Sequence, residues 1–287
     1  MKRAIIISLL LLFYSHMTSA ESAEKTLKKF GVALTNSLIS QKSKYSEDSC
    51  YFGMNWIELK EGVTVLELSD YLSNSGIVLG DVIYENNQKP YLYIDDALNK
   101  LSSLKYPSKA EFNVYNPVDG FRTIVIECAF SRGELWKDIE PFRKYLSIAR
   151  GENIITEANF LIEKYGASAY YYHVLANAHK KFAKASKSDK GKKLSASEQY
   201  LIAEAGVNNW KQRLLAHRFT NDSSKYRIIS AAKKAASSLQ KLNQYSLSRG
   251  LSTTIDKISK LEVKTTQSPA PGDTKEPPQK EVTNFTQ

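Results

Sequence analysis

Ser75-Gly-Ile-Val-Leu-Gly-Asp-Val-Ile83 is the stretch that decides the fold of this chain of 287 residues. Gly76 and Gly80 favour a turn, because glycine adopts backbone conformations that other residues avoid. The residues that follow predict a buried strand from Asp81 to Glu85. The stretch therefore predicts a turn that leads through Gly-Asp into a β-strand.

Short β-rich runs separated by turn residues surround this stretch and predict four more strands. These are Met54 to Leu59, Gly62 to Leu68, Ala110 to Tyr115 and Phe121 to Cys128. Between them, apolar residues from Ile94 to Leu104 recur at helical spacing after the acidic pair Asp95 and Asp96, which favours a helix start. Asn116 to Gly120 predicts the turn of a hairpin.

Helical patterns flank the β-rich segment on both sides. Leu27, Phe30, Leu34 and Leu38 predict an amphipathic helix from Glu24 to Ser40 within an N-terminal segment, 21–48. After Gly133 the predicted helices are Leu135 to Ala149 with a disturbance at Pro141, Ile154 to Tyr165, Ser168 to Lys184, Ser195 to Phe219, Ser223 to Ser248 and Thr253 to Leu261. Their predicted ends fall near Gly166, Gly191, Asn221-Asp222 and Gly250.

Both ends of the chain are expected to lie outside the folded part. Residues 1–20 begin with Lys2 and Arg3, continue with a short apolar run and close with Thr-Ser-Ala, which predicts a cleaved secretory signal peptide. The alternative is a retained anchor, but the apolar run from Ala4 to Tyr14 spans only about half of a ~30 Å hydrocarbon core. Residues 263–287 are rich in proline and predict a disordered tail. We expect a soluble protein of the periplasm.

The composition limits the kind of protein without identifying its partner. With 42% hydrophobic and 24% charged residues, the chain is neither wholly disordered nor collagenous. Lysine and arginine number 40 against 30 acids, so removal of Lys2 and Arg3 with the signal peptide leaves 38 against 30, a net charge of +8.

Lysines are densest between Lys180 and Lys193, which is compatible with an anionic envelope surface or simply with a solvated helix end. Nucleic acid is not an expected partner of an exported protein.

The segment from Tyr51 to Cys128 resembles a bacterial PDZ domain of the type attached to exported serine proteases and secretion components. The resemblance rests on four stretches in the family's order: Tyr51-Phe-Gly-Met54, Gly62-Val-Thr-Val-Leu-Glu-Leu68, Ser75 to Ile83, and Ile94-Asp-Asp-Ala-Leu-Asn-Lys-Leu101. It implies an α+β protein in which a small PDZ-like β-sandwich or barrel domain, 49–131, precedes an all-α helical domain, 134–262.

The resemblance also implies a peptide-binding groove between an edge strand and a helix. Backbone N–H groups of Phe52, Gly53 and Met54 would hold a carboxylate, and the strand from Met54 would pair with an extended peptide. The candidate peptide-binding residues are Tyr51, Phe52, Gly53, Met54, Trp56, Leu98 and Leu101. Met54, Leu98 and Leu101 would equally suit an ordinary core, and the indole of Trp56 is large enough to fill the groove itself.

Cys50 and Cys128 are the two cysteines of the chain. An isolated pair in an oxidising compartment more often forms a disulfide than two free thiols, so we predict an intramolecular bond. Two buried thiols are the alternative. Two cysteines without nearby histidines do not make a zinc site, and the sequence predicts no metal and no cofactor.

The sequence shows no catalytic constellation. His173, His179 and His217 all fall in predicted helices, and neither Gly-x-Ser-x-Gly nor His-Glu-x-x-His occurs. We therefore expect a noncatalytic periplasmic adaptor that binds the C-terminus or an extended segment of an envelope protein. The alternative is a regulatory or accessory subunit of an envelope protease or secretion machine.

Overall fold

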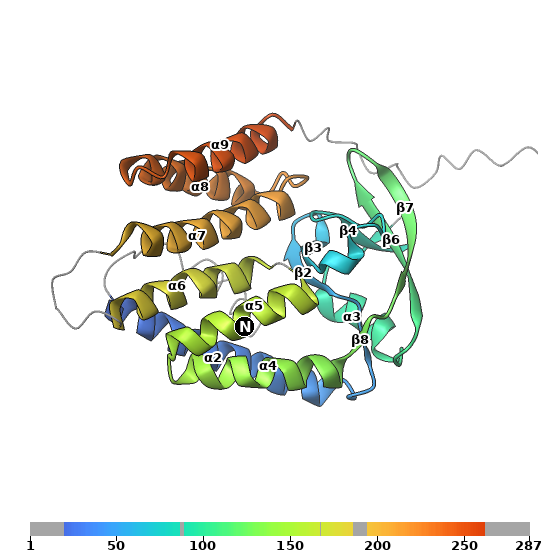
Figure 1. Cartoon of the computed structure of the whole chain (residues 1–287). Coiled ribbons are helices and arrows are strands. Elements are labelled where there is room, and N and C mark those ends of the chain that lie inside the picture. The colour runs from blue at the N-terminus through green and yellow to red at the C-terminus, as the bar shows by residue number, and fades with distance from the viewer. Residues whose placement is uncertain (1–19, 87–88, 167, 186–193, 262–287) are drawn as a thin grey trace, which may run out of the picture.

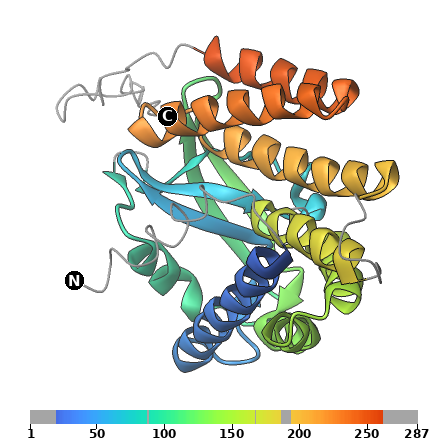
Figure 2. The ribbon, with the colours of Figure 1, turned by 90° about the vertical axis from the view of Figure 1, so that its left-hand side faces the viewer.

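A computed structural model describes residues 20–86, 89–166, 168–185 and 194–261. Helices are stacked from α4 at one end to α9 at the other, and the strands lie along one side of this stack (Figures 1 and 2). The chain is therefore an α+β protein, as the sequence predicts. Outside the described residues lie the predicted signal peptide except Ala20, most of the lysine-rich segment and the predicted tail.

The strands form one antiparallel sheet and one short ribbon. In the sheet the order is β2 (Met54–Leu59), β3 (Gly62–Leu68), β4 (Val82–Asn86), β6 (Lys109–Asn116) and β7 (Gly120–Glu127), with β5 (Lys89–Pro90) also paired to β4. The ribbon pairs β1 (Cys50–Tyr51) with β8 (Phe130–Ser131). All five predicted strands are confirmed, and β2 and β3 have the predicted bounds. One helix of the β-rich segment, α3 (Ile94–Ser102), lies near β2.

The remaining helices form two packed groups. The first is α2 (Ala20–Lys44), α4 (Arg132–Ser147), α5 (Gly151–Tyr165) and α6 (Ala169–Ala185), and the second is α7 (Ala196–Ala216), α8 (Ser223–Lys241) and α9 (Tyr245–Ser259). Leu27 and Phe30 of α2 are buried in the same apolar cluster as Phe142 and Leu161. The N-terminal helix is thus part of the helical layer rather than a separate segment.

The predicted helix from Ser223 to Ser248 is wrong, because the chain breaks into α8 and α9. Asn243 takes a left-handed conformation with φ 57°. Its N–H donates to the carbonyl of Gln240, and the N–H of Gln244 donates to that of Leu239, the two bonds of a Schellman helix end. Gly250, predicted to end a helix, lies inside α9.

The predicted helix from Leu135 to Ala149 corresponds to α4, which continues through Pro141 as one element.

Asp81 organises the stretch on which the fold depends. Its side chain is fully buried, and it accepts hydrogen bonds from the amide of Asn116 at 2.6 Å and the backbone N–H of Val78 at 2.8 Å. It also forms an ion pair with Arg122 of β7. Burial raises the pKa of Asp81, while these hydrogen bonds and the Arg122 charge oppose that rise. The Gly-Asp sequence therefore fastens the turn before β4 to the hairpin of β6 and β7.

The helical layer contacts both ends of β3. At one end the side chain of Ser69 donates to the carbonyl of Tyr165, and a Cβ on Gly166 would overlap the backbone of Ser69. At the other end Glu61 accepts from the hydroxyl of Thr220 at 2.6 Å and the N–H of Asn221 at 2.8 Å. The sheet and the helices are thus held together at two points of one hairpin.

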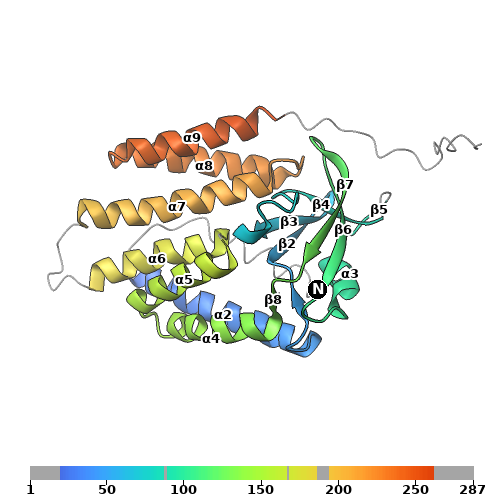
Figure 3. The same ribbon diagram turned by 45° about the vertical axis from the view of Figure 1, so that its right-hand side comes forward.

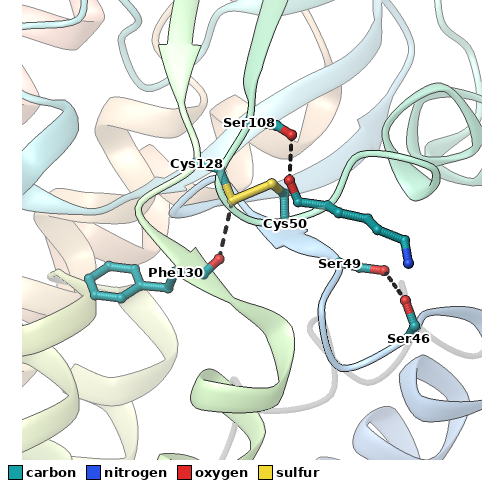
Figure 4. The surroundings of a disulfide bond; sticks show 7 residues. Ser46, Ser49, Cys50, Ser108, Cys128 and Phe130 are labelled. Carbon is teal, nitrogen blue, oxygen red and sulfur yellow. Dashed lines mark hydrogen bonds between the residues drawn. A yellow bond between two sulfur atoms is a disulfide. The ribbon is translucent and has the colours of Figure 1, made fainter.

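Cys50 and Cys128 form the predicted disulfide, with Cα atoms 5.6 Å apart and a sequence separation of 78 (Figure 4). The bond joins β1 to the residue that follows β7. Both cysteines are buried in the core of the sheet, and the sulfur of Cys128 contacts the carbonyl of Phe130 at 3.3 Å. The disulfide therefore fixes the chain two residues before the loop at Phe52 and Gly53.

Candidate functional site

The candidate site begins at β2, which forms one edge of the sheet. Among the described strands β2 pairs with β3 alone. Val63 and Val65, which lie opposite Glu58 and Trp56, donate their N–H groups away from β2, to the carbonyls of Tyr91 and Asp81. Since hydrogen-bonded and non-hydrogen-bonded pairs alternate in an antiparallel ladder, the backbone groups of Glu58 and Trp56 point away from β3.

The loop before β2 continues this free edge. The N–H of Ser69 donates to the carbonyl of Gly53 at 2.7 Å, which makes Met54 and Leu68 a non-hydrogen-bonded pair. Met54 therefore also directs its N–H away from β3. Within the described part of the chain, neither Phe52 nor Gly53 donates a backbone hydrogen bond. Together these residues present a short run of donors at the head of the edge strand.

Gly53 gives the loop its shape. Its φ of +69° is left-handed, a conformation that suits consecutive N–H groups turning toward one anion. A Cβ at this position would lie 2.5 Å from Cε1 of Tyr71 and 2.8 Å from the hydroxyl of Ser69. Both Phe52 and Gly53 are buried as residues, and N–H groups without a partner in the described chain are available to a ligand. A carboxylate is the simplest group that would accept from them.

The side chains of this loop do not line an open groove. Phe52 and Met54 are buried in the sheet core, where the ring of Phe52 packs edge-on against Phe112 at 5.5 Å. Tyr51 points into the helical core and packs against Tyr165 at 6.2 Å. The side chain of Met54 is therefore a core residue, the alternative to a groove residue, and so is that of Phe52, while their backbone remains at the free edge.

Trp56 largely fills the space beneath α3. Its ring lies 6.5 Å from that of Phe112, and with Ala97 and Leu101 it lines a cavity of only about 10 Å³. That is about the room of one water molecule. The indole N–H is buried without a hydrogen-bond partner in the described residues. A ligand side chain therefore finds little depth here unless Trp56 moves.

The helix α3 closes the other side of the site. The carboxylate of Glu58 accepts from the N–H of Ile94 at 3.0 Å, which ties the far part of β2 to the start of the helix. Leu98 and Leu101 are both half-buried, and Leu101 packs on the sheet core. Lys44, at the end of α2, pairs with Asp95 at 2.8 Å. The structure thus brings β2, the Gly53 loop and α3 together around one shallow site.

A second small space lies behind the loop, toward the helices. Glu67, Ser69, Tyr165 and Tyr171 line this space of about 20 Å³. Glu67 accepts from the amide of Asn55 at 2.8 Å and the N–H of Tyr170 at 3.4 Å. Burial raises the pKa of Glu67, and the hydrogen bond from Asn55 opposes that rise. This polar contact connects β2 to the start of α6.

Sequence reasoning missed Ser69 and Tyr71, which crowd Gly53 from the turn after β3. In the sequence both residues lie in the polar run between β3 and Gly76, and this run contains no motif that would mark them as part of a site. Among the described residues no three His, Cys, Asp or Glu side chains are grouped so that they could hold a metal ion. His217 contacts the hydroxyl of Ser224 through Nδ1 at 3.2 Å, but this histidine is buried.

Comparison of the chain with protein-family models, with curated proteins and with solved structures gives no match. In the described part of the chain, no helix combines the length and apolar character needed to cross a bilayer. The inference about function therefore rests on the geometry of the site.

Proposed function

We propose that the protein is a noncatalytic adaptor of the periplasm that binds the C-terminus of an envelope protein in a PDZ-like groove. The observation that carries this proposal is the run of backbone donors at Phe52 and Gly53, two buried residues at the head of an edge strand whose N–H groups find no partner among the described residues. A carboxylate there accepts hydrogen bonds that the chain itself leaves unmade.

The rest of the peptide adds to β2 as a further antiparallel strand. The outward backbone groups of Met54, Trp56 and Glu58 provide the pairing, and each hydrogen bond contributes about 1 kcal/mol. Because main-chain groups supply most contacts and the cavity beside Trp56 is small, the site selects a free carboxylate more strongly than a particular side chain.

A peptide library with free C-termini, screened by fluorescence anisotropy against the purified protein, tests this proposal. The best binders are then made with an amidated C-terminus. We expect amidation to weaken binding at least tenfold, because an amide carries no negative charge for the loop. Equal binding of both forms, or no binding by any peptide, overturns the proposal.

Two matched variants locate the binding site. Leu98→Asp places a charge on the half-buried face of α3 and is expected to weaken binding. Leu242→Asp makes the same change at an exposed position between α8 and α9, far from β2, and is expected to leave binding unchanged (Figure 1). Both variants should keep the thermal melting of the parent protein. A result in which Leu242→Asp alone weakens binding places the ligand on the helices.

A further inference from the structure

The opposite edge of the sheet is also free and has a different chemistry. β7 pairs only with β6 among the described strands, and it lies at the outer rim of the sheet (Figures 1 and 3). No proline and no lysine lies within β7, and its two charged residues, Arg122 and Glu127, already form ion pairs with Asp81 and Lys109. Natural sheets usually protect an edge of this length with proline or lysine, so an unprotected edge indicates a pairing surface.

The hydrogen-bond pattern shows which residues face outward. The N–H of Cys128 donates to the carbonyl of Ser108, so the neighbouring pair Lys109 and Glu127 is non-hydrogen-bonded. Every second pair along an antiparallel ladder is of the same kind, so the pairs formed by Val125, Thr123 and Phe121 are also non-hydrogen-bonded. These three residues therefore also direct their backbone groups away from β6.

The side chains of the same residues lie on the exposed face of the sheet. Val125 is 61% exposed and Phe121 is 40% exposed. The ring of Phe121 packs against Tyr115 at 4.7 Å and Tyr84 at 4.9 Å, so the apolar surface continues from β7 across β6 to β4. An open strand edge and an apolar face thus coincide on one side of the molecule.

We propose that β7 pairs antiparallel with β7 of a second copy of this chain, about a two-fold axis at Thr123. In this register Thr123 lies opposite Thr123 of the second copy, and Phe121 lies opposite Val125. The pairing puts the aromatic ring of Phe121 against the β-branched Val125, a favourable cross-strand pair. At the axis it places two small uncharged Thr123 side chains, whose hydroxyls already donate to Asn113 of their own chain at 2.9 Å.

A second copy fits this edge better than an unrelated peptide does. A two-fold axis brings each residue near itself, so a charge at the centre would meet a like charge. The outward-facing residues Phe121, Thr123 and Val125 are all uncharged, and Arg122 between them lies on the other face of the sheet, where it pairs with Asp81. The carboxylate of Glu127, at the end of the strand, is already neutralised by an ion pair with Lys109. A shift of the register by two residues would place Phe121 opposite Glu127 in one direction and opposite Thr123 in the other, and would lose the apolar pair in both.

Charge substitution at the axis tests the proposal, with molar mass measured by light scattering over a range of concentrations. We expect the parent protein to be a dimer. Thr123→Lys and Thr123→Glu are each expected to raise the dimer dissociation constant at least tenfold, because like charges meet at the axis. An equal mixture of the two variants should regain the dimer, since lysine then lies opposite glutamate.

Thr253→Lys, the same change at an exposed position of α9, is the control and should remain a dimer. Circular dichroism melting of each variant shows that it is folded. A monomeric parent protein, a Thr123→Lys variant that stays dimeric, or a mixture that stays monomeric overturns the proposed interface. These outcomes are separate from peptide binding at β2, which lies at the other edge.

Discussion

Replacing Gly53 by alanine tests the crowded loop, and Gly120 provides a matched control. Both glycines are left-handed, with φ of 69° and 70°. Alanine at either position therefore costs about 1–2 kcal/mol of backbone strain. A Cβ on Gly120 meets nothing within 4 Å, whereas a Cβ on Gly53 lies 2.5 Å from the ring of Tyr71 and 2.8 Å from the hydroxyl of Ser69.

The difference between the two variants isolates this crowding. The hydroxyl of the buried Ser69 is held by its hydrogen bond to the carbonyl of Tyr165. Tyr71 is 41% exposed, but moving its ring aside gives up the edge-on contact with Phe130 at 5.8 Å, so we expect Gly53→Ala to cost about 1–2 kcal/mol more than Gly120→Ala. Urea unfolding followed by circular dichroism measures both free energies. Combining Gly53→Ala with Tyr71→Ala should recover part of the excess. Equal losses for the two glycine variants would refute the argument that Tyr71 and Ser69 confine the loop.

Three further predictions concern stability and are measured by urea unfolding. Replacing Cys50 and Cys128 together by alanine should cost about 4 kcal/mol, since the bond closes a loop with a separation of 78 residues; a loss below about 1 kcal/mol contradicts this. Burial, aided by the nearby Arg213 charge, lowers the pKa of His217 to about 4. Because the unfolded chain then binds a proton before the folded protein does, the free energy of unfolding is unaffected by His217 above about pH 6.5 and falls by about 3 kcal/mol as the pH drops toward 4. A His217→Gln variant with the same pH dependence as the parent would show that another group is responsible. Arg122→Met should cost about 3 kcal/mol because it leaves the Asp81 carboxylate buried without its cation, and an unchanged midpoint contradicts that role.

The strands could be predicted well because their signals are local. Turn residues bound β2 and β3 on both sides, and both strands have the predicted bounds. The disulfide followed from the cysteine count and the expected compartment. Asp81 could be placed before a strand from the Gly-Asp sequence, but its partners Asn116 and Arg122 come from a hairpin more than 30 residues further along the chain. No local pattern specifies such a contact.

The errors came from features that depend on packing or on an uncommon residue. The end of α8 uses Asn243 where glycine is the usual signal, so the break before α9 was missed. The resemblance places Tyr51 in the groove with its neighbours, yet its side chain turns into the helical core because α5 supplies Tyr165 on that side. Hydrophobic side chains at Phe52 and Met54 are compatible with a groove wall and with a core, and only the sheet arrangement separates the two.

The free backbone donors of the loop are the centre of this account, and nuclear magnetic resonance observes them directly. The protein is labelled with ¹⁵N and titrated with the tightest peptide from the free-carboxylate screen, and separately with its amidated form. We predict that the free-carboxylate peptide shifts the amide signals of Phe52, Gly53 and Met54 most strongly and slows their hydrogen exchange, while the amidated peptide does so at least tenfold more weakly. Shifts confined to the helices, with these three amides unchanged, would contradict the claim that the loop binds a carboxylate.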